Sequence, residues 1–419
     1  MLLRFEVANH RSILEPVELS LIAVDEDRPS VRSFELLNEK VLTVAGIYGP
    51  NASGKSNILE ALAWLSSAVR NSLRTWEDGI PRDPFRFGAG PESPSTFAIE
   101  MIASDVRYAY HLEVTDSEVL SESLVSYPKR QPRTLFERQG MEIDFRRGIG
   151  STNGTRELLT PTTLALSAIM RFSEAEVMPF GDELRNIMSL GIRRRRRVGD
   201  RLVTLATQLP GTDSIFQEDL ASFREMRESA LAMLHFADLG IDSVQVTSPQ
   251  EESPARLSLD KARLTLLHRV AGQEIPFDLE DESAGTRTWF RLIGPALSAL
   301  RTGSVLLFDE IDASLHPRLS ARLIEIFQDP ATNPRGAQLI FTTHDTSLLN
   351  SLNRDEVWLT EKGESGETTL TALAEFGGDK VRRSLNLEKA YLQGRFGAVP
   401  ELDQAALRRV LGLASGGES

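Results

Sequence analysis

The segment GPNASGKS, residues 49–56, limits the possible folds of this chain more than any other feature. It fits the pattern G-x-x-x-x-G-K-[ST] in full. An apolar run, Val41–Tyr48, precedes it, and the apolar residues that follow it between 58 and 69 recur at spacings of four, three and four, typical of one helix face. A buried strand, a glycine-rich turn and a helix N-terminus together form a cradle for phosphate groups. We therefore expect an α/β fold of the P-loop type.

Each part of this loop has a predicted role in binding a nucleotide. The glycines permit the tight turn and let backbone N–H groups approach the phosphates. The pattern predicts that Lys55 reaches the β- and γ-phosphates and that Ser56 ligates Mg²⁺. The candidate binding residues are Gly49, Pro50, Asn51, Ala52, Ser53, Gly54, Lys55, Ser56 and Asn57.

Two further apolar runs end in polar side chains. The run SVLLFDE, residues 304–310, predicts a buried strand that delivers Asp309 to the metal and Glu310 to an attacking water. A second strand, Leu339–Phe341, leads to His344, which at such a strand end can bond a γ-phosphate or the catalytic water. The alternatives are a solvated acidic strand end and a structural histidine, and the phosphate loop upstream favours the functional interpretation of both.

The segment DESAGTRTWFRL, residues 281–292, lies just before the Asp309 strand. By itself Ser283 followed by Gly285 is equally typical of a serine N-cap with a permissive glycine. In chain order, however, GPNASGKSN, ESAGT, LLFDEIDASLHP and FTTHD resemble the ABC-type ATPases of the RecF/SMC/OLD class. The opening FEVANHRSILEPVELSL and the segment 384–400 are similar to compact bacterial AAA-type ATPases of anti-phage defence operons, the AriA and RloA type.

This resemblance implies an ABC-type ATPase head with an antiparallel β subdomain and a helical insertion. It implies ATP and Mg²⁺ as cofactors, with Asp309 as the Walker B aspartate, Glu310 as the catalytic glutamate and His344 as the switch histidine. Ser283 and Gly285, at the start of a predicted helix, resemble the signature residues, which contact the γ-phosphate of ATP bound to the opposite protomer. Asp312 falls in the D-loop. The resemblance therefore implies a homodimer or a higher homo-oligomer that shares its ATP sites.

One element of that pattern has no assigned residue, the Q-loop glutamine. Gln131 and Gln139 are candidates by location only. Four further histidines show no metal-ligand spacing: His10, His111, His235 and His268. A fifth, His316, is close in sequence to Asp312, and we expect it to serve local packing.

Composition excludes several classes of protein. The chain has 419 residues, of which 41% are hydrophobic, and it contains no cysteine, so it has neither disulfides nor a thiolate metal site. Its net charge of -13 excludes general coating of nucleic acid. No apolar run is long enough to span a membrane and no signal peptide is evident, so we expect a cytoplasmic protein without membrane contact.

An arginine run interrupts this acidic chain. The five consecutive residues are Arg193, Arg194, Arg195, Arg196 and Arg197. They indicate either a contact with DNA, RNA or an acidic protein, or a solvated helix face that is paired with glutamates. No aromatic residue interleaves with them, so the run does not indicate base stacking.

Four regions are expected along the chain. Residues 1–157 form the first part of the head, 158–245 the helical insertion, 246–400 the second part of the head, and 401–419 a tail. Within the insertion, the patterns predict helices over 164–177, 180–190 and 216–240, whereas 148–156 reads as a break between elements.

The expected function is that of a sensor or scaffold ATPase in a phage-defence system that acts through a separate effector protein. About 75 residues follow His344, too few for a nuclease domain with its own metal site. One alternative is a RecF-like DNA repair or recombination ATPase that clamps DNA. The other is an assembly scaffold that binds ATP and barely hydrolyses it.

Overall fold

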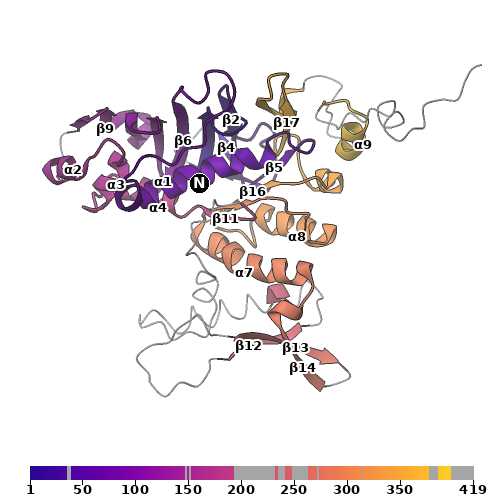
Figure 1. Ribbon diagram of the computed structural model, residues 1–419. Helices are drawn as coiled ribbons and strands as arrows, with labels where there is room; N and C mark the ends of the chain where they lie inside the picture. The colour runs from indigo at the N-terminus through magenta and orange to yellow at the C-terminus, as the bar shows by residue number, and fades with distance from the viewer. Residues whose placement is uncertain are drawn as a thin grey trace, which may run out of the picture.

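Two large sheets and the helices between them form most of the molecule (Figure 1). The computed structural model describes residues 1–34, 39–146, 149–150, 152–192, 232–234, 241–247, 263–270, 273–313, 315–376 and 386–397. Within these residues the sheets have seven, six, three and two strands. The mixed α/β class expected from the sequence is confirmed.

The six-stranded sheet carries the segments that the sequence singled out. Five neighbouring strands are parallel, and the last strand pairs antiparallel with the fifth. In spatial order the strands are β11 (Met188–Leu190), β15 (Val305–Phe308), β16 (Gln338–Thr342), β5 (Val44–Tyr48), β17 (Val357–Lys362) and β18 (Thr368–Ala372). Since the carboxyl ends of parallel strands meet at one edge of a sheet, the residues after β5, β15 and β16 gather there.

Both faces of this sheet are buried, which explains its unbroken apolar runs. Val305 and Leu307 of β15 belong to the core on the α1 side, whereas Leu306 and Phe308 belong to the core on the side of α7 and α8. This alternation follows from the two-residue period of a strand. The three helices are α1 (Lys55–Thr75), α7 (Ala284–Thr302) and α8 (Pro317–Gln328). Figure 1 shows α1 on one side of the sheet and α7 and α8 on the other.

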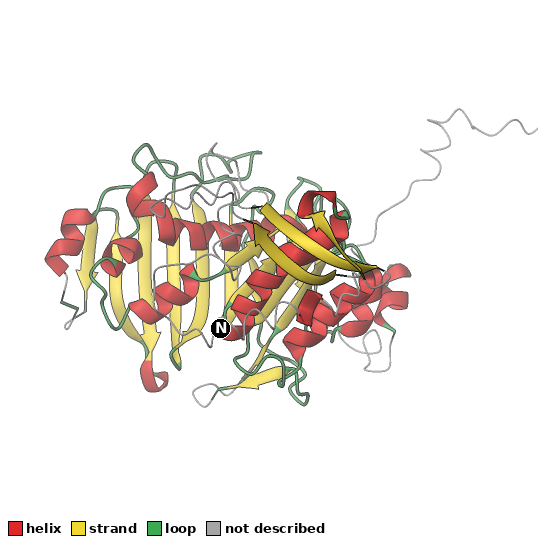
Figure 2. Cartoon of the chain, turned by 90° about the horizontal axis from the view of Figure 1, so that it is seen from below, coloured by secondary structure: helices red, strands yellow, loops and turns green. Residues whose placement is uncertain are grey.

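The seven-stranded sheet is antiparallel throughout, as the resemblance implied for the β subdomain. Its strands lie side by side in Figure 2, with helices across one face. Alternate residues of its central strands are buried, as expected for a sheet packed on one side. In order the strands are β10 (Glu142–Phe145), β9 (Arg133–Gln139), β8 (Val119–Tyr127), β7 (Val106–Val114), β6 (Ser95–Ala103), β1 (Leu2–Ala8) and β2 (Val17–Ser20).

Three short helices follow this sheet in the chain: α2 (Thr152–Leu158), α3 (Ala165–Met170) and α4 (Met178–Arg185). Helix α2 begins inside the segment that was expected to be a break. Helices α3 and α4 pack against α1, and their buried residues join the main core. The buried side chains of α3 and α4 therefore belong to the same core as α1. Most of the expected helix 216–240 lies outside the described residues, as do Arg193 to Arg197.

Three sequence predictions need correction in detail. The expected helix 164–177 is shorter in the structure, because α3 ends at Met170. The expected helix 180–190 ends at Arg185, and Met188–Leu190 form β11 of the central sheet instead. The expected strand Val41–Tyr48 divides at Thr43 into β4 (Lys40–Leu42) and β5. The first of these pairs with β3 (Val31–Ser33), whereas β5 pairs with β16. The two-stranded sheet consists of β3 (Val31–Ser33) and β4 (Lys40–Leu42). The errors at β11 and β5 arise because these strands pair with β15 and β16, which are distant in sequence.

A small sheet precedes the signature helix and lies apart from the two large ones in Figure 1. It contains β12 (Ile241–Thr247), β13 (Arg263–Val270) and β14 (Gln273–Asp278). The remaining described elements are the short helices η1 (Pro128–Arg130), η3 (Leu279–Asp281), η4 (Thr346–Ser351), η5 (Leu373–Glu375) and α9 (Leu387–Leu392). No helix in the described part of the chain is long and apolar enough to cross a membrane.

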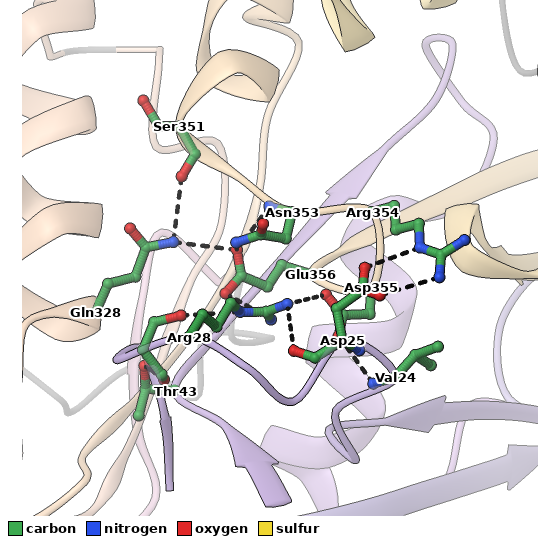
Figure 3. Close-up of polar contacts among 11 residues, drawn as sticks. Val24, Asp25, Arg28, Thr43, Gln328, Ser351, Asn353, Arg354, Asp355 and Glu356 are labelled. Atoms are coloured by element: carbon green, nitrogen blue, oxygen red, sulfur yellow. Dashed lines mark hydrogen bonds and ion pairs between the residues drawn. The ribbon is translucent and has the colours of Figure 1, made fainter. Parts of the chain in front are cut away.

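A buried network of charges joins the N-terminal part of the chain to the loop before β17 (Figure 3). Arg28 lies 2.8 Å from the carboxylate of Asp355 and 3.1 Å from that of Glu356. Gln328 of α8 donates to the other oxygen of Glu356 at 3.1 Å, and the Glu356 carbonyl accepts from Gly46 of β5 at 2.8 Å. The network thus connects the N-terminal loop, α8 and the strand that leads into the phosphate loop.

Candidate functional site

The phosphate loop connects β5 to α1 at the carboxyl edge of the central sheet, as the motif predicts. Gly49 and Gly54 have φ angles of 153° and 99°, in the region that favours glycine. A Cβ atom on Gly49 would collide with the hydroxyl of Thr360, and one on Gly54 with the hydroxyl of Thr368. Both glycines are therefore required by backbone conformation and by the close approach of β17 and β18.

Hydroxyl side chains from distant segments hold this loop in place. Ser53 Oγ lies 2.6 Å from Thr360 Oγ1, and Thr368 Oγ1 donates to the Ser53 carbonyl at 2.8 Å. Thr368 also bonds Ser12 Oγ at 2.6 Å, and Asn57 donates to the same Ser12 oxygen at 2.5 Å. Sequence reasoning missed Ser12, Thr360 and Thr368, because no local pattern marks them.

Lys55 points back into the loop. Its Nζ donates to the carbonyls of Gly49 at 2.9 Å and Pro50 at 3.1 Å, and it lies 3.4 Å from His344 Nδ1. Burial lowers the pKa of Lys55 to about 8, although the carboxylates of Asp312, Asp309 and Glu310 act in the opposite direction. The ammonium therefore lies where a phosphate in the cradle would accept its hydrogen bonds.

Asp309 and Ser56 meet at the mouth of the loop. Ser56 Oγ donates to Asp309 Oδ1 at 2.8 Å, and the backbone N–H of Asp309 donates to the Leu190 carbonyl at 2.9 Å. A hydroxyl and a carboxylate are the oxygen ligands that Mg²⁺ takes from proteins, with phosphate oxygens and water completing its octahedron. Across the described residues, this site included, no group of three or more acidic or histidine side chains is arranged to hold a metal.

Glu310 follows Asp309 in an unusual backbone conformation. Its φ angle is 54°, in the left-handed region, and its side chain is exposed at the edge of the sheet. The Glu310 N–H donates to Thr342 Oγ1 at 2.8 Å, and that hydroxyl donates to Asp309 Oδ1 at 2.6 Å. Thr342 therefore fixes the two consecutive acidic residues relative to each other.

Asp312 and His344 are also brought together. Asp312 Oδ1 accepts from Thr343 Oγ1 at 2.6 Å and from the His344 backbone N–H at 3.2 Å. Burial and the nearby Lys55 charge lower the pKa of His344, so its exposed imidazole is neutral at neutral pH. A neutral imidazole has one donor and one acceptor nitrogen.

The predicted signature residues lie at the N-terminus of α7. Ser283 caps that helix by accepting from the Thr286 N–H at 3.1 Å, and its side chain is exposed. In the described part of the chain, the hydrogen bonds of Ser283 stay within its own helix start and do not reach the phosphate loop. The fold thus assembles Lys55, Ser56, Asp309, Glu310, Asp312 and His344, and leaves Ser283 and Gly285 outside that group.

The strand beside β15 is β11, which sequence reasoning assigned to a helix. The residue after it, Gly191, has a φ angle of 75°, and a Cβ there would collide with the Asp309 carbonyl. Gln131 follows η1, two residues before β9, and Gln139 is the last residue of β9. In the sheet, β6, β7 and β8 separate β9 from β1. Neither glutamine therefore belongs to this site, and residues 186–192 beside Asp309 contain no glutamine.

Three of the remaining histidines have defined local contacts. His10 is buried among aromatic rings, His268 bonds Glu282 at 2.5 Å, and His316 caps α8 by accepting from the Arg318 N–H at 3.2 Å. His111 lies on β7, and His235 is outside the described residues.

Comparisons with known proteins agree with this geometry. A family model described as "AAA domain, putative AbiEii toxin, Type IV TA system" matches residues 44–350, nearly three quarters of the chain. No curated protein matches.

Solved structures similar to this chain include heads of SMC proteins. A structure of the SmcHead bound to the C-winged helix domain of ScpA has 15% identity and a TM-score of 0.48, covering 88% of this chain and 97% of that one. The SMC head domain from Thermotoga maritima has 14% identity and a TM-score of 0.41, with coverages of 88% and 98%. The Smc head domain with a coiled coil and joint derived from Pyrococcus yayanosii has 13% identity and a TM-score of 0.42, with coverages of 93% and 98%.

Proposed function

The chain belongs to the AAA-domain family matched over residues 44–350, and from that premise we propose that it is a Mg²⁺-dependent, ATP-switched homodimer. It is a P-loop ATPase with an ABC-type head. The observation that carries the proposal is the convergence of Lys55, Ser56 and Asp309 at one sheet edge, with Ser56 Oγ 2.8 Å from Asp309 Oδ1.

In this proposal the chain's own residues bind and orient the nucleotide. Lys55 exchanges its bonds to the Gly49 and Pro50 carbonyls for phosphate oxygens, and Ser56 and Asp309 hold the metal. When bound, Mg²⁺ neutralises charge on the β- and γ-phosphate oxygens. Backbone N–H groups for the phosphates come from the loop residues Gly49, Asn51, Ala52, Ser53, Gly54 and Asn57. Pro50 has no N–H and contributes only to the shape of the loop.

Glu310 and His344 are the proposed catalytic residues beside Lys55. The exposed Glu310 carboxylate orients an attacking water, because its backbone is fixed by Thr342 at the strand end. His344, whose backbone N–H is held by Asp312, presents a neutral imidazole that donates to the γ-phosphate or the water. Asp312 thereby links the switch histidine to the D-loop that resembles the one in ABC-type ATPases.

The proposed dimer rests on the signature segment. Ser283 is exposed at the N-terminus of a 19-residue helix, where a backbone dipole favours an anion. Because Ser283 and Gly285 do not join the phosphate loop of their own chain, a second copy supplies them in a head-to-tail pair. ATP closes that pair and its hydrolysis opens it.

The biological role that we propose is a sensor or scaffold in a phage-defence system with a separate effector protein. Support comes from the family description, "AAA domain, putative AbiEii toxin, Type IV TA system". It also comes from the resemblance of the opening segment and of residues 384–400 to ATPases of the AriA and RloA type. Such a subunit works in the cytoplasm. Arg193 to Arg197 are a candidate contact for DNA or RNA, and replacing the five arginines by glutamate tests it by salt-dependent DNA binding.

The Glu310→Gln variant tests the switch. With Mg²⁺ and ATP it is expected to retain unhydrolysed nucleotide and to double its mass by light scattering, whereas Lys55→Ala remains monomeric with its nucleotide site weakened. Ser283→Arg in the Glu310→Gln background is the matched control, because it should bind ATP without pairing. If the Glu310→Gln protein retains ATP but stays monomeric, the proposal that two chains share each ATP site is contradicted. The proposal that the chain binds ATP would still stand.

A further inference from the structure

A cavity of about 360 Å³ lies between α1, β11 and residues 76–83. Its lining includes His10, Glu60, Ser66 and Arg70, together with Ser189 of β11. The helix residues that line it begin at Glu60, beyond the turn of α1 that carries Lys55 and Ser56. The cavity is therefore distinct from the phosphate cradle, although it adjoins the same helix.

Two uncharged polar side chains in this cavity are buried without hydrogen-bond partners in the part of the chain that the structure describes. A third buried oxygen, Glu60 Oε2, has no hydrogen bond but forms an ion pair with Arg11. His10 is 2% exposed, and neither its Nδ1 nor its Nε2 atom has a partner. Ser66 is also 2% exposed, and its Oγ atom has none. Buried polar groups are nearly always satisfied by protein, water or ligand, so two such side chains on one cavity indicate an occupant.

The His10 ring is fixed and uncharged. Its ring centroid lies 5.8 Å from that of Phe97, in an edge-on arrangement, and 6.5 Å from that of Trp64. Burial, aided by the adjacent Arg11 charge, lowers the pKa of His10 to about 4. A neutral imidazole offers one N–H donor and one nitrogen acceptor, and the Ser66 hydroxyl offers both functions.

The charged groups around the cavity already have partners within the protein. Arg11 pairs with Glu60, and Arg70 donates to the Ile187 carbonyl at 2.8 Å. Arg82 donates to the Asp116 carboxylate at 2.6 Å. The rest of the wall is mixed: Ala63, Trp64, Ala68 and Ile192 supply apolar surface, and Ser67 and Asn71 supply polar surface. An ionic ligand would gain no free counter-charge here, whereas an uncharged, flat molecule would fit the polar and apolar walls together.

We infer that this cavity binds a small, planar, uncharged heteroaromatic molecule with a donor and an acceptor on one edge, the chemical class of nucleobases and nucleosides. Such an edge satisfies His10 and Ser66, and a volume of about 360 Å³ lies at the small end of the range of about 300–1,000 Å³ usual for ligand pockets. The bound molecule touches α1, which begins with Lys55, and β11, whose Leu190 carbonyl accepts from Asp309. It therefore contacts two elements that frame the ATPase site.

The test uses the full chain with its ATP site saturated by Mg²⁺ and a non-hydrolysable ATP analogue. Adenosine, guanosine, cytidine and uridine are each titrated while tryptophan fluorescence and the melting temperature are recorded, since Trp64 and Trp76 line the cavity. At least one nucleoside is expected to give a saturable change and to raise the melting temperature. The absence of both effects for all four up to millimolar concentration overturns the inference.

Two variants tie the binding to this cavity. His10→Phe keeps a ring but removes both nitrogens, and it is expected to weaken binding at least tenfold. Ser66→Leu fills the cavity, abolishes binding and leaves the fold intact. His111→Phe on β7 is the matched histidine control, and it retains full affinity. If His10→Phe and Ser66→Leu bind the nucleoside as tightly as the parent chain, the site is elsewhere and the inference fails; an unfolded Ser66→Leu leaves His10→Phe to decide.

Discussion

The hydroxyl of Thr342 lies 2.6 Å from the carboxylate of Asp309 and donates its single proton to it. The same oxygen accepts the backbone N–H of Glu310 at 2.8 Å. One side chain at the end of β16 thus fixes two consecutive acidic residues at the end of the neighbouring strand. Both carboxylates depend on a residue that lies more than thirty positions away in the sequence.

Thr342→Val is expected to lower kcat about 10- to 100-fold, the usual effect of removing a hydrogen bond behind a metal ligand. The substitution keeps the shape of the side chain but leaves the Asp309 carboxylate and the Glu310 N–H without this partner. Steady-state ATPase assays over a range of Mg²⁺ concentration measure the effect, which should include a weaker apparent affinity for Mg²⁺. Thr342→Ser restores the hydroxyl and should recover most of the rate; equal loss in both variants would point to packing instead.

Nucleotide affinity should depend on pH through Lys55. Since burial lowers the pKa of Lys55 to about 8, the ammonium is present below that pH and is lost as the pH rises through it. Above about pH 8, phosphate binding must take up a proton, so affinity falls by up to about tenfold per pH unit. Calorimetric titration of an ATP analogue measures the slope. Lys55→Arg, which stays charged, should remove this slope, and a flat profile for the parent chain would contradict the prediction.

Arg28→Ala is expected to destabilise the protein by about 3–5 kcal/mol, because it leaves the buried carboxylates of Asp355 and Glu356 without their cation. The side chains of Asp355 and Glu356 are 2% and 0% exposed. Burial also raises the pKa of Glu356, so the loss should become smaller as the pH falls and that carboxyl takes up a proton. Urea denaturation at two pH values measures both effects.

The matched control for Arg28 is Arg354, which pairs with Asp25 at 2.9 Å in the same network. Its side chain is 31% exposed, and pairs of this kind contribute about 0–1 kcal/mol. Arg354→Ala should therefore shift the unfolding midpoint little. An equal shift for the two variants would mean that burial is not what makes the Arg28 interactions strong.

Gly191→Ala is expected to reduce ATP turnover, because the new Cβ would collide with the Asp309 carbonyl. Gly140→Ala is the matched control, since Gly140 has a similar left-handed φ of 55° but no atom lies within 4 Å of its added Cβ. Both substitutions carry a backbone cost of about 1–2 kcal/mol. Turnover and melting temperature separate the two effects: only Gly191→Ala should lose activity, and equal activities would contradict the contact.

The sequence predicted those parts of the site whose chemistry lies in contiguous residues. The loop 49–56, the acidic pair Asp309–Glu310 and His344 each follow an apolar run, and the structure brings all of them to one edge of the sheet. Their proximity was predictable because parallel strands end together. The roles of these residues in catalysis remain predictions.

Other features were invisible to pattern reasoning because they depend on partners distant in the chain. Ser12, Thr360 and Thr368 support the phosphate loop, yet isolated hydroxyl residues carry no signal in sequence. β11 has only three residues, so its apolar side chains fit a helical pattern as well as a strand. Its identity as a strand comes from pairing with β15, more than a hundred residues later.

The amino-acid sequence by itself therefore determined the P-loop class and the residues at the ends of the central strands, because short-range periodicity and glycine requirements are local properties. The antiparallel β subdomain was expected only from the resemblance to ABC-type ATPases. Only the tertiary structure decided that Thr342 joins Asp309 to Glu310, that β11 completes the central sheet, and that His10 and Ser66 share a cavity. These arrangements arise when distant segments pack together, and a hydrogen bond between such segments depends on the folded backbone rather than on spacing along the chain.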